Sequence, residues 1–224
     1  MKENSQLKST KGIFRIPILY VVGIWFVYWI EIYFNFNFNK YGVFPRELFG
    51  LRGVFLTHFI HSDVDHLFNN SVPLFVLLLS LFYFYKETAY KVLLFGGIAS
   101  GFLTWLIARE AYHIGASGIV YLLFSFIFFS GMIRKHYRLV ALSLITIFLY
   151  GSMIWYVLPI KDGMSWEGHL SGFLVGLFFA IFYRNKGLVR LEHQYTHTEF
   201  DLLFDQEGNY VPPKIEEEQS EEIV

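Results

Sequence analysis

The segment Trp166–Tyr183, WEGHLSGFLVGLFFAIFY, is 18 residues long and carries mostly apolar side chains. A helix that crosses a membrane needs roughly 20 mainly apolar residues, so this segment predicts a membrane-spanning helix. Gly168, Gly172 and Gly176 recur at every fourth position, a pattern that lets two membrane helices approach closely. His169 lies on the same stretch, and an ionisable group inside a span is by default a candidate functional residue. The segment therefore predicts a close helix contact beside a functional histidine.

Five further segments of similar character extend this prediction to the rest of the chain. The six predicted spans are Phe14–Phe34, His66–Tyr85, Tyr90–Ala108, Gly115–Ile133, Leu139–Leu158 and Trp166–Tyr183. Of the 224 residues, 54% are hydrophobic and 17% are charged, whereas a soluble domain carries about a quarter charged residues. The sequence therefore predicts an all-α membrane protein built as a bundle of six transmembrane helices.

The basic residues divide unequally between the two sides of the predicted membrane. If the N-terminus is cytoplasmic, then of the Lys and Arg residues up to Arg190 twelve fall in inner segments and five fall in outer ones. Inner segments of membrane proteins are enriched in positive charge, so both termini are predicted to lie inside. The formal net charge of −1 provides no basic field for nucleic acid. The absence of cysteine excludes disulfides, thiolate nucleophiles and cysteine-based zinc sites.

The predicted spans divide the chain into three parts. Residues 1–13 form a cytoplasmic N-terminal segment, and residues 14–186 form the membrane domain. Within this domain, residues 35–65 form a long outer loop whose Phe and Tyr side chains favour the membrane interface. Residues 187–224 end in an acidic run, Glu216–Glu222, and their composition is typical of a flexible cytoplasmic tail.

Three polar residues lie at matched positions along three of the spans: Asn70, Ser117 and His169. At a rise of 1.5 Å per residue, each lies roughly 22–25 Å from the basic residue that marks the inner end of its span. Those inner markers are Lys86, Arg134 and Arg184. Because the hydrocarbon core is about 30 Å thick, all three polar residues are expected at one level, about a turn below the outer surface. Each of these residues, taken alone, could simply make a structural contact between helices. Their common depth in the membrane favours a functional site.

A serine and a histidine at one depth support nucleophilic catalysis. An imidazole can remove the proton of the Ser117 hydroxyl, which is otherwise a weak nucleophile. Ser117 begins its span, where free backbone N–H groups favour developing negative charge. His66 and Asn70 lie one turn apart on one helix face and could donate hydrogen bonds to an oxyanion. Tyr121, one turn after Ser117, could pack against the ring of His169.

Three motifs, in this order and spacing, give the chain a family resemblance. They are THFIHSDVDHLFNN at Thr57–Asn70, GASGIVY at Gly115–Tyr121 and GHLSGFLVG at Gly168–Gly176. With them, the region Tyr41–Tyr183 resembles the rhomboid intramembrane proteases of the bacterial type. The resemblance implies a serine endopeptidase with a six-helix core that cleaves single-span membrane proteins near the outer surface. The resemblance also implies that substrates enter the site laterally, gated by the fifth span and the loop Pro159–Ser165.

The resemblance also implies roles for particular residues. Ser117 would be the nucleophile that forms the acyl-enzyme, and His169 the general base, with no acidic third member. His66, Asn70 and the backbone N–H of Ser117 would form the oxyanion hole. Supporting residues would be Gly115, Gly118, Tyr121, His61, Gly172 and Gly176. No metal and no cofactor are implied, and the partners are transmembrane substrates and the lipid bilayer. The composition, rich in Phe, Ile, Asn and Lys, and the short loops fit a bacterial inner membrane protein. The oligomeric state is not indicated.

Two other functions remain open at this point. His58, His61 and His66, with Asp63 and Asp65 between them, could hold a metal ion in a membrane hydrolase. No H-E-x-x-H motif is present to support that alternative. The second is a catalytically silent relative that binds membrane substrates without cutting them. Such proteins typically lose the serine or the histidine, and this chain has both.

Overall fold

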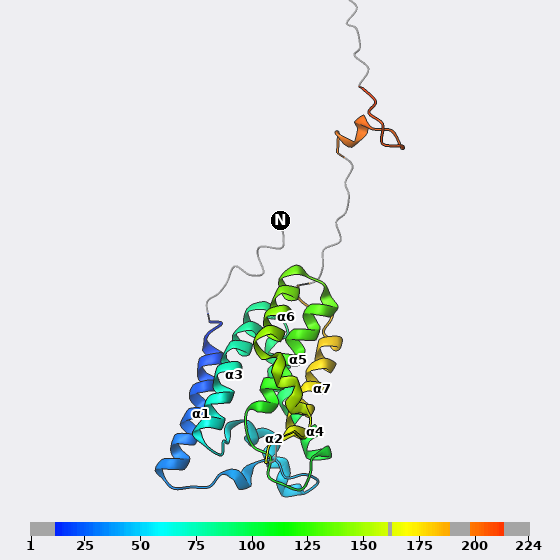
Figure 1. Ribbon diagram of the computed structural model, residues 1–224. Helices are drawn as coiled ribbons and strands as arrows, with labels where there is room; N and C mark the ends of the chain where they lie inside the picture. Colours follow the sequence, from blue (N-terminus) through cyan, green and yellow to red (C-terminus); the bar gives the residue numbers. More distant parts are fainter. Residues whose placement is uncertain (1–11, 161–162, 189–197, 213–224) are drawn as a thin grey trace, which may run out of the picture. The chain divides into compact units, whose positions relative to one another are not determined.

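The described part of the chain is all-helical, as predicted. The structure is a computed structural model that describes residues 12–160, 163–188 and 198–212. Within these ranges there is no β-strand, only two isolated bridges. The α-helices are α1 (Arg15–Tyr33), α2 (Gly53–Leu56), α3 (Val64–Phe84), α4 (Ala89–Ile107), α5 (Ser117–Arg134), α6 (Tyr137–Tyr150) and α7 (Trp166–Phe182). Figure 1 shows the longer helices side by side in one bundle.

The predicted spans coincide with helices to within two residues at nearly every boundary. Among the described residues, α1, α3, α4, α5 and the segment Tyr137–Val157 are long and apolar enough to cross a membrane. α7 is apolar but has 17 residues, slightly fewer than a full span. The continuous helix predicted for Leu139–Leu158 is wrong in one respect. α6 ends at Tyr150, and the chain continues as the 3₁₀ helix η5 (Gly151–Val157). Glycine at the junction disfavours α-helix, and a tightened last turn is common there.

The long outer loop lies across one end of the bundle (Figure 1). Besides α2 it contains three short 3₁₀ turns, η2 (Asn39–Tyr41), η3 (Leu48–Arg52) and η4 (Thr57–Phe59). The loop ends two residues earlier than predicted, because Asp63 caps α3, which begins at Val64. Its Oδ1 accepts the His66 N–H at 2.8 Å, which satisfies a free donor of the first turn.

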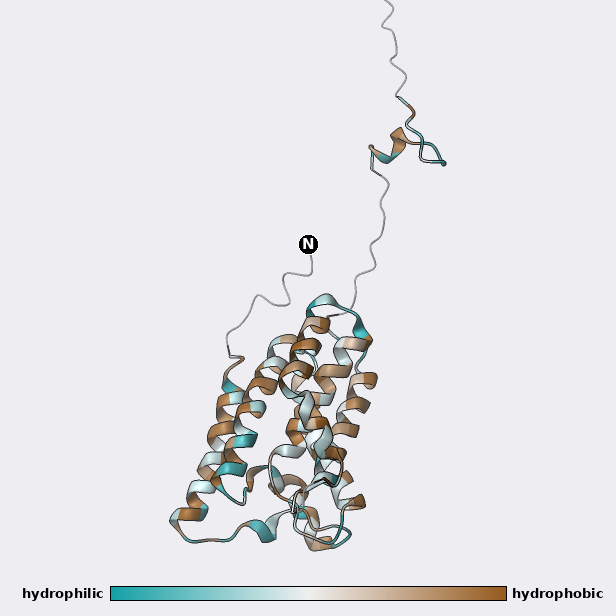
Figure 2. Cartoon of the chain, viewed as in Figure 1, coloured by the Kyte–Doolittle hydropathy of each residue, from teal (hydrophilic) through white to brown (hydrophobic). Residues whose placement is uncertain are grey.

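α5 forms the centre of the bundle. Of its residues 67% are buried, against 17% for α1, and it packs against α3, α4, α6 and α7. Outward faces remain apolar: Phe148 on α6 is 86% exposed and Leu19 on α1 is 65% exposed. Figure 2 shows hydrophobic residues, in brown, along the outer helices. A soluble protein rarely exposes such surface, so these faces are suited to lipid and the chain is an integral membrane protein.

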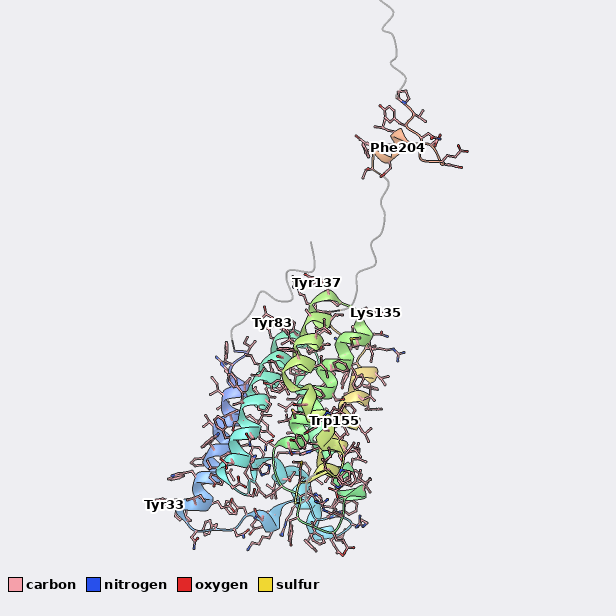
Figure 3. All side chains as sticks on the ribbon, in the orientation of Figure 1. Tyr33, Tyr83, Lys135, Tyr137, Trp155 and Phe204 are labelled. Carbon is pink, nitrogen blue, oxygen red and sulfur yellow. The ribbon has the colours of Figure 1, made fainter. Side chains whose placement is uncertain are left out.

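The first turns of α3 and α5 lie at the same end of the bundle as the outer loop. In Figure 3, Tyr33 at the end of α1 marks this end, while Tyr83, Lys135 and Tyr137 mark the opposite one. α6 runs back from Tyr137 toward the loop end, so α7, which follows it, starts there as well. The arrangement brings the starts of α3, α5 and α7 together, and these starts carry the polar residues singled out in the sequence.

Residues 198–212 are described as a unit of their own. They contain the 3₁₀ turn η6 (Asp201–Leu203) and a bridge between Phe204 and Tyr210. Asp205 closes the turn between these two residues by accepting the backbone N–H groups of Glu207 and Asn209. Much of the two predicted cytoplasmic segments, residues 1–11, 189–197 and 213–224, including the acidic run, lies outside the described residues.

Candidate active site

Ser117 is the first residue of α5, and a tight turn leads into it. Gly115 has a φ of 114°, a backbone conformation that side chains disfavour. The next residue, Ala116, donates its N–H to Nε2 of His61 at 3.3 Å. Ser117 itself is half-buried. The turn therefore presents the serine hydroxyl together with unpaired N–H groups at the N-terminus of a central helix.

Gly115 also has no room for a side chain. A Cβ there would lie 2.7 Å from Nε2 of His66 and 3.7 Å from Oγ of Ser117. Both functional groups therefore lie against the Cα of Gly115 from different helices. This position needs glycine for its backbone angle and for the close approach of two site residues.

His169 lies in the first turns of α7, and its ring is held on two sides. The ring stacks on Tyr121, with centroids 4.3 Å apart and planes 12° apart. Its Nδ1 lies 2.9 Å from the carbonyl oxygen of Tyr156 in η5. Because a carbonyl can only accept, Nδ1 carries the hydrogen, and the neutral ring has its lone pair on Nε2. This is the tautomer that a general base for a serine requires.

The glycine ridge of α7 lies directly against α5. A Cβ on Gly172 would fall 2.1 Å from the carbonyl oxygen of Gly118, and one on Gly176 would fall 2.3 Å from that of Leu122. Ser125 on α5 donates its hydroxyl to the Phe173 carbonyl at 2.7 Å. The two helices that carry Ser117 and His169 are therefore packed backbone to backbone.

His66 and Asn70 lie one turn apart on α3, His66 partly buried and Asn70 6% exposed. Nδ2 of Asn70 donates to the His66 carbonyl at 3.0 Å, which leaves its second N–H for another acceptor. Nδ1 of His66 lies 3.1 Å from the hydroxyl of Ser62. That hydroxyl donates its one hydrogen to Oδ2 of Asp63 at 2.6 Å, so it accepts from Nδ1 of His66 and leaves the lone pair of the neutral ring on Nε2. Nε2 can donate beside Gly115 once the ring is protonated or once Ser62 turns its hydroxyl to Nδ1.

The histidines of the outer loop do not converge on a common point. Nε2 of His58 lies 3.3 Å from the Gly97 carbonyl, while Nε2 of His61 accepts from Ala116. Burial lowers the pKa of His58 to about 4. Burial, and then the nearby His66, lower the pKa of His61 to about 4. Among the described residues, no three His, Cys, Asp or Glu side chains are placed to hold a metal ion. The metal alternative therefore finds no ligand cluster there.

A small cavity of about 20 Å³ lies beside Ser117, between the outer loop and the starts of α5 and α7. Its size suits roughly one water molecule. Polar side chains line much of it: Thr57, His58, Ser100, Thr104, His113, Ser117 and Ser165. Ser100 and Thr104 were not predicted as site residues, because single small polar residues are common at helix contacts.

The expected site residues thus gather at one end of the bundle, but the expected hydrogen bond between Ser117 and His169 is not formed. In the described part of the chain, no hydrogen bond joins Oγ of Ser117 to His169. Such bonds are often long in free hydrolases and shorten when substrate binds. The residue missed by sequence reasoning is Tyr156, which acts through its carbonyl and leaves no side-chain pattern.

Comparison with known proteins places this arrangement in a family. Uncharacterized proteins of Mycobacterium tuberculosis and Mycobacterium bovis are each 33% identical over 154 residues, covering 62% of this chain. An uncharacterized protein of Mycobacterium leprae is 32% identical over 145 residues, covering 58% of this chain. The chain spans about three fifths of the length of these relatives, with 62% of the first two and 55% of the third covered.

A family model described as the rhomboid domain matches residues 48–186. The matched region contains α3, α5 and α7 entire, and with them every residue of the site described above. Because that match covers more than half of the sequence, the chain belongs to the rhomboid family.

Proposed function

We propose that the protein is an intramembrane serine endopeptidase in which Ser117 is the nucleophile and His169 the general base. The carrying observation is the state of His169. Its ring is stacked on Tyr121 and bonded through Nδ1 to the Tyr156 carbonyl, which leaves Nε2 as the basic atom. A main-chain carbonyl thus takes the orienting place that an aspartate has in a catalytic triad.

The reaction would proceed in two halves. In the first, Nε2 of His169 takes the Ser117 proton as Oγ attacks the scissile carbonyl carbon, and a tetrahedral oxyanion forms. The proton then passes to the leaving amine, the C–N bond breaks and an acyl-enzyme remains. In the second half, His169 takes a proton from water, which attacks the ester and releases the second product and the free serine.

His66, Asn70 and the backbone N–H of Ser117 would stabilise the oxyanion. Among the described residues the Ser117 N–H at the start of α5 has no hydrogen-bond partner, and Asn70 has one N–H left for an acceptor. Nε2 of His66 and Oγ of Ser117 both lie within 4 Å of the point that a Cβ on Gly115 would take. His66 would donate from Nε2 once its ring is protonated or once Ser62 turns its hydroxyl to Nδ1. A single donor of this kind typically contributes about 3–4 kcal/mol to the transition state.

Hydrolysis within a membrane also requires water beside the acyl-enzyme. The cavity at Ser117 has room for about one water and is lined by hydroxyl and imidazole groups that could hold it. A polar cavity at this point supports hydrolysis of the ester rather than its accumulation.

The membrane setting follows from the arrangement of the helices. α7 is roughly 25 Å long at 1.5 Å per residue, and with the five candidate spans it would complete six. The positive-inside bias supports a topology in which both termini would lie in the cytoplasm and the site near the outer face. Substrates would be single-span membrane proteins that reach the site laterally near α6 and η5. The location would be a bacterial inner membrane, in keeping with the mycobacterial relatives.

Cleavage of a single-span model substrate by the purified full-length protein in detergent tests the proposal. Wild type is compared with Ser117→Ala and His169→Ala. We expect cleavage by wild type and a loss of at least a thousandfold in both variants, because the dyad acts as a unit. Equal cleavage by wild type and Ser117→Ala would refute the serine mechanism. Binding of substrate without cleavage by wild type would instead support the silent relative.

A further inference from the structure

Glu167 is a buried carboxylate that the reaction outlined above does not use. It lies in the first turn of α7, two residues before His169, and its side chain is 3% exposed. Burying a carboxylate is costly unless the charge is paired and hydrogen-bonded. The groups that Glu167 contacts therefore indicate what it does.

Arg109 pairs with Glu167 from the loop between α4 and α5. Its Nη1 donates to Oε1 of Glu167 at 3.1 Å, and its backbone N–H donates to the same oxygen at 3.4 Å. Its Nη2 donates to the carbonyl of Met164 at 2.7 Å. One arginine thus fastens the loop that leads to Ser117 onto the turn that leads to His169.

His113 makes a second link between the same two segments. Its Nε2 lies 3.0 Å from the Arg109 carbonyl and therefore carries the hydrogen, so Nδ1 accepts the hydroxyl of Ser165 at 2.6 Å. Its main chain pairs in both directions with Val43 of the outer loop. The loop before Ser117 is therefore held against the outer loop on one side and against the start of α7 on the other.

We propose that Glu167 is a positioning residue that, clamped by Arg109, sets the placement of the Ser117 turn relative to His169; this rests on the proposed function. Glu167 does not hydrogen-bond to Nδ1 of His169, which is bonded to the Tyr156 carbonyl. Its Oε2 has no hydrogen-bond partner among the described residues. A buried pair that is only half satisfied contributes little stability compared with apolar packing. The pair is better explained by the geometry it imposes.

Kinetics of full-length Glu167→Gln test the proposal. The amide still accepts at Oε1 but loses the charge that holds Arg109, and small displacements of reacting groups cost about tenfold to a hundredfold in rate. We expect kcat to fall by about that factor, with KM nearly unchanged. The kcat of Arg109→Gln should fall by a similar factor. The kcat of the double variant should be little lower than that of either single variant, because the two residues act as a pair. Restoring charge with Glu167→Asp should recover part of the rate.

Glu110→Gln is the matched control. Glu110 follows Arg109 on the same loop, but its carboxylate is exposed and pairs with Arg46 at the long distance of 3.8 Å. This variant should leave kcat and KM unchanged, because an exposed pair at that distance contributes little.

Amide hydrogen exchange in residues 109–116 supplies a readout that does not depend on cleavage. Loosening the clamp should raise exchange there at least tenfold in Glu167→Gln and leave α3 unchanged. If Glu167→Gln lowers only the yield of folded protein, with kcat per folded molecule and loop exchange at wild-type values, the positioning role is overturned. If wild type and Ser117→Ala do not differ in cleavage, the proposed function fails, and loop exchange alone then decides whether the clamp exists.

Discussion

The imidazole of His169 lies flat on the phenol ring of Tyr121, with the centroids 4.3 Å apart. Tyr121 follows Ser117 by one turn on α5, so the stack joins the helix of the proposed nucleophile to the helix of the proposed base. Both rings also bond to η5: the Tyr121 hydroxyl donates to the Met153 carbonyl at 2.8 Å, and His169 bonds to the Tyr156 carbonyl. The ring of His169 is thus fixed at its face and at the Nδ1 edge, and Nε2 is the ring nitrogen left to accept a proton.

Replacing Tyr121 separates these two contributions. Tyr121→Phe keeps the stacked ring and loses only the bond to Met153, so kcat should fall by no more than about threefold, given a net hydrogen-bond contribution near 1 kcal/mol. Tyr121→Ala removes the stack, which is worth up to about 1.5 kcal/mol beyond burial, and kcat should fall about tenfold or more. Steady-state cleavage of one substrate by both variants provides the measurement. Equal losses in the two variants would mean that the hydroxyl, not the ring, positions His169.

The glycine ridge of α7 should tolerate no methyl group. Gly172→Ala would place a Cβ 2.1 Å from the Gly118 carbonyl oxygen, so α7 must move away from α5. Overpacking of this kind costs about 1–3 kcal/mol and would also displace His169. We expect a lower unfolding temperature and a loss of cleavage of about a hundredfold, as for misplaced reacting groups.

Gly23→Ala on α1 is the control for this substitution. Its nearest neighbour would be a Phe59 ring carbon at 3.9 Å, an ordinary contact. Alanine is the better helix former, so stability should be equal or slightly higher and activity unchanged. Wild-type activity in Gly172→Ala would show that the two helices need not pack so closely for catalysis.

Removal of an oxyanion donor should lower kcat and leave KM nearly unchanged. The donors act on the transition state, so Asn70→Ala and His66→Ala should each reduce kcat by about a hundredfold to a thousandfold. Asn70→Asp is a useful companion because it keeps the size of the side chain but offers no donor when ionised. The measurement is kcat and KM for each variant with one substrate. A rise in KM with unchanged kcat would assign Asn70 to substrate binding instead.

The helices were predictable because a membrane span leaves a strong pattern in the sequence. A run of about 20 apolar residues is hard to produce otherwise, which is why the boundaries of α3, α4 and α5 agree to within two residues. The break of α6 at Gly151 was not predicted. The hydropathy of the segment continues unchanged to Leu158, and only the backbone changes from α to 3₁₀ geometry.

The site was predictable only where side chains carry the chemistry. Ser117 and His169 are polar groups in apolar surroundings, so they could be found in the sequence. The Tyr156 carbonyl could not, because every residue has one. The pair of Arg109 and Glu167 joins positions 58 apart in the chain, and such a contact depends on the packing of α4 against α7. Glu167 did leave one sign, an acidic residue inside an apolar run.

Acidification should destabilise the fold through His58 and His61. Burial lowers the pKa of each to about 4 from an ordinary value of 6.5, so between these pH values the unfolded chain binds more protons than the folded one. The free energy of unfolding is therefore highest above about pH 6.5 and falls as the pH drops toward 4, by up to about 3 kcal/mol per histidine.

The unfolding temperature of Ser117→Ala, measured from pH 7 to pH 4, should show this decline without interference from self-cleavage. His61→Gln keeps an acceptor for the Ala116 N–H but cannot titrate, so its decline should be shallower, and that of the His58→Gln, His61→Gln double variant shallower still. Parallel curves for all three proteins would mean that other groups set the acid sensitivity and that neither histidine is held neutral by the fold.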